Sequence, residues 1–211
     1  MTAIIANPVR GRLNAAVFRI LDGYADRIFG RRKAALFADL PDTVVEIGPG
    51  TGANLRYYRP GTTVEAVEPN PHMHADLAAA AERRGVGLRL HAAGAQAMPF
   101  PDASVDAVVS TLVLCTVPDQ AAAIREILRV LRPGGRLVFV EHVAAGEHSG
   151  HGLVQRALAR PWRWLFEGCD VRRDTEAALR SAGFASVTVE RYLARSVFVP
   201  INPQIGGVAV R

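Results

Sequence analysis

The chain has 211 residues and a formal net charge of +5, and 49% of its residues are hydrophobic while 21% are charged. This length predicts one domain with a full core, and the composition excludes a disordered or fibrous chain. Lys33 is the sole lysine among 25 basic residues, so the charge reflects general arginine usage, and we expect no nucleic-acid partner.

Residues 1–40 precede the first predicted strand and are expected to form one or two amphipathic helices. A segment in this position has no place in the sheet, so it serves either as a packing helix or as a lid over an acceptor pocket. The N-terminus lacks the pattern of a signal peptide, and no apolar run reaches the ~18 residues of a membrane span. We therefore expect a cytoplasmic protein whose basic first helix makes at most weak contact with a membrane surface. The apolar residues at helical spacing are Leu13, Val17, Ile20, Leu21, Tyr24 and Ile28.

From residue 43 onward, apolar strand patterns alternate with helical patterns, which predicts an α/β fold. The strands are near-continuous apolar runs, as expected of parallel strands that are buried on both faces of a sheet. Asn70 and Pro71 are expected to cap and open the second helix, and Asp119 is expected to cap the third. The predicted strands are 43–47, 63–68, 87–92, 105–111 and 135–142, and the predicted helices are 52–58, 71–84 and 119–131.

The last third of the chain is predicted to contain two helices and an antiparallel pair of strands. Asp174 is expected to cap the second of these helices, and Gly183 to close it. No linker or internal repeat interrupts the order of elements, so residues 41–211 are predicted to form one compact unit behind the helical segment 1–40. The elements are a Gly/His-rich stretch at 146–152, helices over 153–166 and 175–182, and strands over 186–193 and 207–210.

A glycine-rich turn, Gly48-Pro49-Gly50-Thr51-Gly52, follows the first strand, and a helical pattern begins directly after it. Glycines allow the main chain to approach a ligand closely, and the N–H groups at the start of a helix are free to bind one. Glu68 follows Glu46 by 22 residues and ends the second strand. A nucleotide-binding α/β unit has, at this position, the acid that binds ribose hydroxyls.

The turn does not fit a phosphate ligand. No Gly-Lys-Ser/Thr follows it, so it is not a P-loop, and glycines at alternate positions do not make the dinucleotide pattern GxGxxG. Glu46, directly before the turn, would repel a pyrophosphate but could face a cationic ligand. The two cysteines are far apart in the sequence and are not spaced as metal ligands, so no metal site is predicted.

The turn resembles motif I of the class I S-adenosylmethionine methyltransferases. That resemblance implies a doubly wound, mostly parallel, seven-stranded Rossmann-like sheet, with S-adenosyl-L-methionine as cofactor and S-adenosyl-L-homocysteine as product. Many members have an acid or Asn at the place of Gly94 to bind adenine, so here the main chain of 94–96 or the Gln96 side chain is expected to do so. Met73 is expected either to pack on adenine or to belong to the helix core. The predicted cofactor-binding residues are Glu46, Gly48, Pro49, Gly50, Thr51, Gly52, Asn54, Glu68, Pro69, Asn70, Met73, Gly94, Ala95, Gln96, Thr111 and Leu112.

Side chains beyond the carboxyl ends of the fourth and fifth strands are expected to line the acceptor site, since ligands of open α/β sheets bind there. His142, which ends the fifth strand, is either a structural residue or a base that faces the acceptor. The predicted pocket residues, which would otherwise be core residues, are Leu114, Cys115, Trp162, Phe166 and Cys169.

Longer stretches resemble the alkyl-thiol methyltransferases of animals over nearly the whole chain after about Phe29. They include TLVLC at 111–115, EHVAA at 141–145 and FEGC at 166–169. That resemblance implies S-methylation of a small apolar thiol. O-, N- or C-methylation of a small metabolite or natural product, and a non-catalytic S-adenosylmethionine-binding module, remain alternatives. Members of that family begin with a long apolar membrane anchor, whereas residues 1–31 are basic and interrupted, so we expect a soluble relative whose oligomeric state is open.

Overall fold

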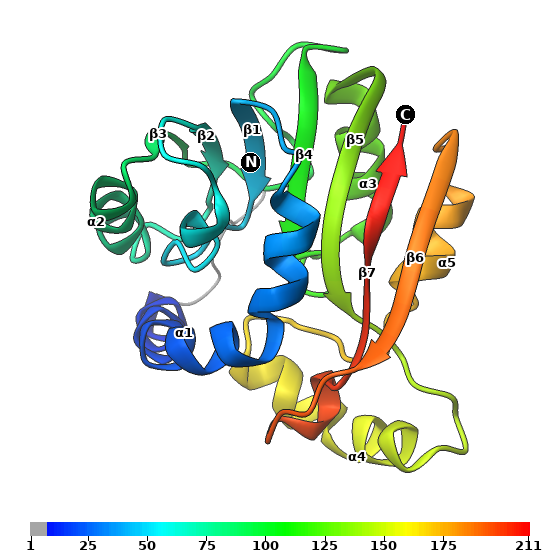
Figure 1. Ribbon diagram of the computed structural model, residues 1–211. Coiled ribbons are helices and arrows are strands. Elements are labelled where there is room, and N and C mark those ends of the chain that lie inside the picture. The colour runs from blue at the N-terminus through cyan, green and yellow to red at the C-terminus, as the bar shows by residue number, and fades with distance from the viewer. Residues whose placement is uncertain (1–7) are drawn as a thin grey trace.

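A seven-stranded sheet runs through the computed structural model, which describes residues 8–211 (Figure 1). Its strand order is β3-β2-β1-β4-β5-β7-β6; the first five strands of the chain are parallel, and β7 is antiparallel to both of its neighbours. This order confirms the predicted doubly wound α/β class and its antiparallel end. The strands are β1 (Thr43–Ile47), β2 (Thr63–Val67), β3 (Gly87–His91), β4 (Val105–Thr111), β5 (Leu131–His142), β6 (Ser186–Leu193) and β7 (Pro203–Val210).

Helices cover both faces of the sheet. In Figure 1, α3 and α5 lie behind the strands, the C-terminal part of α1 runs across the front, and α4 lies beyond the end of β5. Two short 3₁₀ turns, η1 and η2, complete the fold. The helices and turns are α1 (Pro8–Phe37), η1 (Leu55–Tyr57), α2 (His74–Arg84), α3 (Gln120–Val130), α4 (Gly150–Leu165), α5 (Thr175–Ser181) and η2 (Val199–Ile201).

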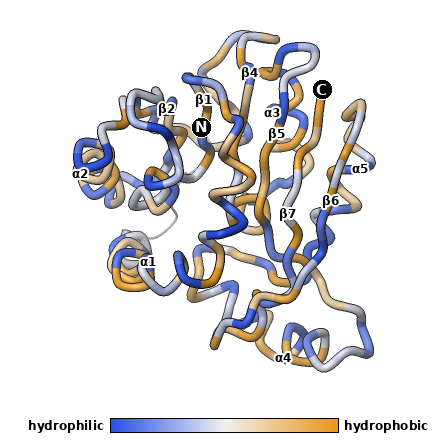
Figure 2. The backbone as a smooth tube through the Cα atoms, in the orientation of Figure 1, coloured by the Kyte–Doolittle hydropathy of each residue, from blue (hydrophilic) through white to orange (hydrophobic). Residues whose placement is uncertain are grey.

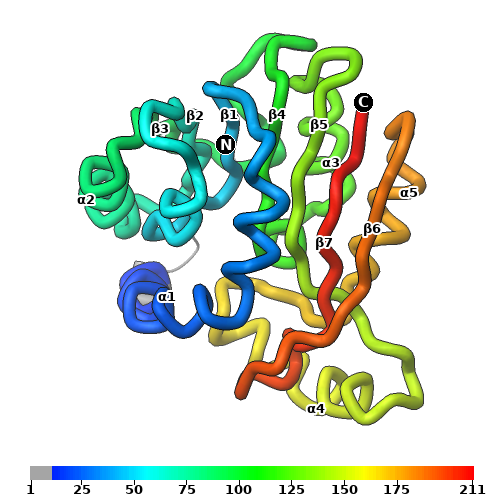
Figure 3. The backbone as a smooth tube through the Cα atoms, in the orientation of Figure 1, coloured from blue at the N-terminus to red at the C-terminus, as the bar shows by residue number. Residues whose placement is uncertain are grey.

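The helix α1 is continuous but changes direction along its length, as the tube in Figure 3 makes clear. Near its start, the Gly11 carbonyl accepts a hydrogen bond of 3.2 Å from Asn70 Nδ2, beyond the end of β2. Near its end, Phe37 is buried against the sheet. One helix is thus present where one or two were predicted, and residues 1–7 lie outside the described part. No helix in that described part is long and apolar enough to cross a membrane.

The core has two layers, one on each face of the sheet. On one face, Ile124 and Ile127 of α3 pack with Leu137 and Phe139 of β5. On the other face, Val138 belongs to a second cluster, formed with α1, α2 and η1. Successive residues of β5 therefore enter opposite layers, which explains the continuous apolar run of this strand. The hydropathy colouring of Figure 2 shows the same apolar band along the central strands.

Two predicted helix starts are wrong. Turns and the short η1 occupy the predicted helix 52–58, so no α-helix begins at the glycine turn. The next helix begins at His74, and Asn70 instead caps the preceding turn, where its Oδ1 accepts from His72 N at 3.0 Å. Two other predicted caps are confirmed: the Asp119 and Asp174 side chains accept from backbone N–H groups three residues later.

Several predicted boundaries are also wrong. Strand β5 begins at Leu131 rather than at 135, because it pairs irregularly with the start of β4. Strand β7 begins at Pro203 rather than at 207, since it pairs with β6 over its full length. Helix α4 begins at Gly150, where the Ser149 side chain caps it by accepting from Gly152 N.

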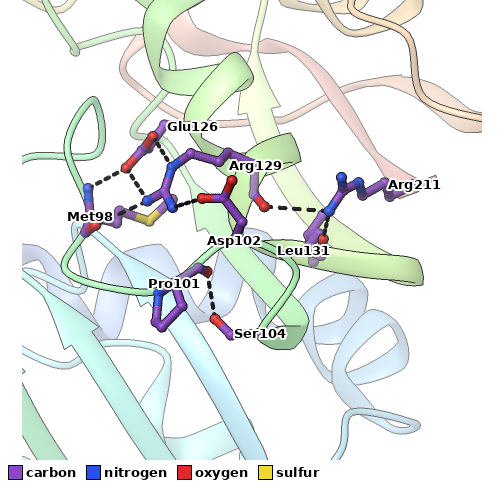
Figure 4. A network of polar contacts seen from close by, with 8 residues as sticks. All are labelled: Met98, Pro101, Asp102, Ser104, Glu126, Arg129, Leu131 and Arg211. Carbon is purple, nitrogen blue, oxygen red and sulfur yellow. Dashed lines mark hydrogen bonds and ion pairs between the residues drawn. The ribbon is translucent and has the colours of Figure 1, made fainter.

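An ion-pair network holds the edge of the sheet where the parallel strands begin (Figure 4). Arg129, near the end of α3, binds Asp102 at 2.6 Å and Glu126 at 2.7 Å, and also donates to the Met98 carbonyl. The Arg211 guanidinium binds the carbonyls of Arg129 and Leu131. The network ties the loop before β4 and the C-terminal residue to α3, at the edge opposite the glycine turn.

The glycine turn sets a steric limit that can be tested by a matched pair of variants. Gly52 has φ +89°, and a Cβ there would lie 2.9 Å from Ala80 Cβ, which α2 holds in place. Gly61 has φ +88°, but a Cβ there would meet nothing within 4 Å. We expect Gly61→Ala to lower the free energy of unfolding by about 1 kcal/mol through backbone strain alone, and Gly52→Ala by about 3 kcal/mol through strain plus overpacking. Urea denaturation measures both; equal losses would contradict the steric interpretation.

Candidate functional site

Glu68 fastens the glycine turn to the end of β2. Its Oε2 accepts from Gly50 N at 2.9 Å and its Oε1 from Asn70 N at 2.8 Å. The parallel register that pairs Ile47 with Val67 places the turn beside this carboxylate. Glu68 is 4% exposed, and burial raises the pKa of its carboxyl group although the two N–H donors act in the opposite direction. The acid predicted to bind ribose is therefore at the rim of the glycine turn.

The three glycines of the turn all have positive φ, which only glycine adopts easily. A Cβ on Gly48 would lie 2.7 Å from Val113, so the turn after β1 touches the loop after β4. A Cβ on Gly50 would meet only Met73 Sδ, at 3.5 Å. The buried Met73 thus packs beside the turn, where both interpretations of it, core residue and adenine contact, remain open.

A buried polar chain lies beneath the turn. Asn54 Nδ2 donates to Glu46 Oε1 at 2.6 Å and to Thr111 Oγ1 at 2.7 Å, and Lys33 Nζ donates to Asn54 Oδ1 at 2.9 Å. Tyr58 completes the group by donating to Glu46 Oε2 at 2.8 Å. One amide side chain therefore links β1, the end of β4 and the helix α1.

Glu46 is buried on the inner side of the turn, and its place among the cofactor-binding residues stays a prediction. The residue is 1% exposed, and Asn54 and Tyr58 occupy its two oxygens. Burial raises the pKa of the Glu46 carboxyl group, and the hydrogen bonds from Asn54 and Tyr58 counteract that effect. In this structure Glu46 binds the side chains of Asn54 and Tyr58, which follow the turn, whereas Glu68 binds the main chain of the turn itself at Gly50.

Sequence reasoning missed Lys33 and Tyr58. The sequence offered one signal for Lys33: it is the only lysine in a chain whose other basic residues, histidine aside, are all arginine. Lys33 is 6% exposed, and burial lowers the pKa of its ammonium group to about 8, while the Glu46 carboxylate acts in the opposite direction.

The loop after β4 is strained and tightly held. Leu112 has φ 59°, a left-handed conformation that is unfavourable for a leucine, and its N–H binds the Val140 carbonyl at 2.9 Å. Glu141 Oε1 accepts from Ser110 Oγ and from the N–H groups of Val113 and Leu114. Sequence reasoning also missed this role of Glu141. Strain of this kind at the end of a strand is a common feature of binding sites.

The other predicted cofactor residues lie at the same edge of the sheet as the glycine turn, but they form fewer contacts with the turn and with Glu68. The segment 94–96 follows β3 and forms its own turn, in which Ala97 N binds the Gly94 carbonyl at 3.1 Å. Ala95 is buried in the core and Gln96 is half-buried. Pro69 is half-buried between Glu68 and Asn70, and Thr51 lines a polar cavity of about 280 Å³ together with Arg19, Asp22 and Arg56.

The predicted acceptor residues form a separate cluster, with one exception. His142 Nε2 is 3.0 Å from Cys169 Sγ, Trp162 Nε1 donates to the same sulfur at 3.3 Å, and the two cysteine sulfurs are 3.8 Å apart. Phe166 stacks on Trp162 with ring centroids 4.3 Å apart. Leu114 is the exception, because it is fully buried in the core layer of α3.

Ionisation in this cluster is strongly perturbed. The hydrogen bond from the Cys115 thiol and the nearby His142 imidazole lower the pKa of the Cys169 thiol to about 4, against the effect of its burial. Burial raises the pKa of the Cys115 thiol well above its usual value. Burial alone would lower the pKa of His142, but Cys169 raises it. The Cys169 thiol and the His142 imidazole therefore shift each other's pKa in opposite directions.

The buried ammonium group of Lys33 predicts a pH-dependent stability. Between pH 8 and the usual lysine value of 10.5, the unfolded chain binds more protons at this position than the folded chain. The free energy of unfolding contributed by Lys33 therefore rises with pH in that window. We expect the stability of the wild type relative to Lys33→Met to increase by about 2 kcal/mol between pH 7 and about pH 9.5. Urea denaturation at each pH is the measurement.

The control for that experiment is Arg31→Met, which removes an exposed cation from the same helix. Its stability difference from the wild type should stay constant over the same range. A Lys33→Met difference that is also constant would show that the ammonium group is not desolvated as the structure implies.

Comparison with known proteins gives the family. A methyltransferase domain model matches residues 45–139. The chain is 37% identical to the thiol S-methyltransferase TMT1A of Homo sapiens over 191 residues, which is 85% of this chain and 78% of the relative, and 36% identical with the same coverage to TMT1B of Rattus norvegicus. A methyltransferase solved in complex with the Haloferax volcanii Trm112 methyltransferase activator has the same fold, with a TM-score of 0.70 at 22% identity over 95% of this chain and 96% of that one. The chain belongs to the S-adenosylmethionine-dependent methyltransferases, in the family that includes TMT1A and TMT1B.

Proposed function

We propose that this methyltransferase moves the methyl group of S-adenosylmethionine to the sulfur of a small apolar thiol. The observation that carries the proposal is a sulfur- and aromatic-lined cluster beyond the ends of β4 and β5, at the same sheet edge as the glycine turn and Glu68. The names of the two relatives, both thiol S-methyltransferases, support the choice of a thiol over other acceptors.

The donor side of the site is built from Glu68 and the glycine turn. S-adenosylmethionine supplies a methyl group that its sulfonium already activates. The Glu68 carboxylate uses one lone pair of each oxygen for Gly50 and Asn70, so further lone pairs remain for the ribose hydroxyls of the donor. Glycines at the turn leave space for the donor to approach the main chain. These features fit the cofactor that the family uses.

The chain has to align and desolvate the two reactants. Holding an acceptor atom about 3–3.5 Å from the methyl carbon can supply ~7–11 kcal/mol of the barrier. A thiol with pKa near ~8.5 is already a few per cent thiolate at neutral pH, so it needs little help from a base. A hydroxyl acceptor would need one, and His142 is the residue placed for that role, although its Nε2 is engaged with Cys169.

The helix α1 has the contacts of a lid. Its Gly11 carbonyl binds Asn70, beside Glu68, and Arg19 pairs with Asp76 of α2 at 3.1 Å. Asp22 pairs with Arg56 of η1, the turn that follows the glycine turn. A helix fixed at these points would cover the donor and has to move when the donor enters. Slower amide hydrogen exchange of α1 with S-adenosylhomocysteine present would support this role, and unchanged exchange would oppose it.

The proposal includes a cytoplasmic setting. Cys115 and Cys169 are free thiols, and their sulfurs are 3.8 Å apart. Thiols this close are readily oxidised to a disulfide outside reducing compartments. A reducing compartment would keep both available for the chemistry of the site.

Loss of the Glu68 carboxylate tests the donor site. We expect Glu68→Ala to weaken the affinity for S-adenosylhomocysteine by about 10- to 100-fold, because hydrogen bonds to a charged group contribute about 1.5–3 kcal/mol. Isothermal titration calorimetry measures the affinity. The matched control is Glu65→Ala, on the same strand, whose carboxylate pairs with Arg89 and His91 and should not affect binding. Equal effects of both substitutions would refute the assignment of Glu68.

A matched acceptor panel tests the reaction itself. Methyl-labelled S-adenosylmethionine is incubated with an alkyl thiol, an alcohol and an amine of the same chain length, and the methylated products are quantified. We expect methyl transfer to the thiol alone, because the thiolate is the most nucleophilic species available near neutral pH. Faster methylation of the alcohol or amine would contradict the thiol assignment. If the protein binds S-adenosylhomocysteine but methylates none of the three acceptors, the non-catalytic module would be favoured instead.

A further inference from the structure

We propose that Cys115, His142 and Cys169 form a three-ligand site for a zinc ion. Their ligand atoms all lie within 4.8 Å of one another, and all three residues are buried. The residues come from the loop after β4, the end of β5 and the segment between α4 and α5. Their separation in the sequence concealed the site, since zinc motifs are usually recognised by short spacing.

The distance between the two sulfurs is that of a tetrahedral zinc site, and all three ligand atoms lie within 4.8 Å of one another. Two thiolates that each lie about 2.3 Å from one zinc ion in tetrahedral geometry are about 3.8 Å apart, and the Cys115 and Cys169 sulfurs are 3.8 Å apart. A zinc-bound imidazole nitrogen would be about 3.5 Å from either sulfur, against 3.0 Å observed between His142 Nε2 and Cys169 Sγ. The imidazole nitrogen would have to move about 0.5 Å away from Cys169 for the ion to enter, and the ion would replace that hydrogen bond.

The surroundings of the three ligands are those of a metal site. Trp162 Nε1 donates to Cys169 Sγ at 3.3 Å, and Thr116 Oγ1 lies 3.5 Å from Cys115 Sγ. Metal-bound thiolates and imidazoles are normally supported by such outer hydrogen bonds. His142 Nδ1 and Gln204 Oε1 are both buried without a hydrogen-bond partner among the described residues, and the two residues are direct partners across β5 and β7. Gln204 Oε1 is therefore the neighbouring acceptor for a hydrogen bond from His142 Nδ1.

The fold holds the ligands without help from an ion. Asp170 N binds the Cys115 carbonyl at 2.9 Å, which joins the segment of Cys169 to the loop of Cys115. Glu141 holds the same loop through Val113 and Leu114. A site held in this way, with soft sulfur and nitrogen ligands, selects zinc over magnesium or calcium. Two thiolates and a neutral imidazole would also balance the double positive charge of the ion, which a buried site requires.

Three protein ligands leave one position of a tetrahedral zinc ion open, as in catalytic zinc sites. This part of the inference rests on the proposed thiol acceptor. A thiol that binds at the open position would lose its proton to solvent and be held as a thiolate. Its sulfur would then form a bond to the methyl carbon as the bond between that carbon and the sulfonium breaks. The resulting thioether is a weaker ligand than the thiolate and would leave the ion.

Metal analysis of the purified, reduced protein tests the site directly. We expect about one zinc ion per chain by elemental analysis, and loss of that zinc in Cys115→Ser, Cys169→Ser and His142→Asn. His148→Asn, in the exposed loop before α4, is the matched control and should retain the metal. Affinity for S-adenosylhomocysteine shows that each variant is folded. Reconstitution with cobalt should add the visible absorption of a tetrahedral ion with thiolate ligands, and propanethiol should change that spectrum.

Several results would overturn the inference. A fully reduced wild type that takes up no zinc or cobalt refutes the site. Full thiol methylation after complete removal of the metal by a chelator refutes the part of the ion in the reaction. A cobalt spectrum that propanethiol leaves unchanged refutes the open fourth position. A protein that binds zinc but methylates no thiol would instead refute the proposed function while leaving the metal site intact.

Discussion

The side-chain amide of Asn54 is the interaction on which the arrangement of the site depends. It donates to Glu46 and Thr111 and accepts from Lys33, so one buried group joins β1, β4 and α1. A carboxylate as deeply buried as Glu46 is stable only with such donors. Because Asn54 and Tyr58 must both reach Glu46, the chain turns back over β1 as the short η1, and no helix starts at the glycine turn.

Buried carboxylates recur at the ends of the parallel strands. Glu46 follows this pattern at β1, Glu68 at β2 and Glu141 at β5, and burial raises the pKa of each. Each accepts hydrogen bonds from an adjacent loop, so the loops at this edge are fixed by charge-assisted bonds rather than by apolar packing. That arrangement leaves loop surfaces free to bind ligands while their backbones stay in place.

The donor and acceptor sides use different physical means. On the donor side, backbone N–H groups, glycines and Glu68 offer polar contacts to a charged, hydroxyl-rich molecule. On the acceptor side, Trp162 and Phe166 surround two sulfurs and an imidazole in an apolar setting. An acceptor that is small and apolar suits the second region, and sulfur chemistry suits its ligand atoms. The strained Leu112 lies on the loop that connects the two regions.

The sequence by itself determined the α/β class, the glycine turn and the acid at Glu68, because these depend on local periodicity and fixed spacing. The doubly wound, seven-stranded sheet was implied by the resemblance to class I methyltransferases, and its strand order came from the structure. The tertiary structure alone decided three contacts. Glu46 is buried and accepts hydrogen bonds from Asn54 and Tyr58, Lys33 donates to Asn54, and Leu114 packs in the core. The tertiary structure also brought Cys115, His142 and Cys169 together. Contacts between residues so far apart in the chain arise from packing of whole elements, and no local pattern encodes them.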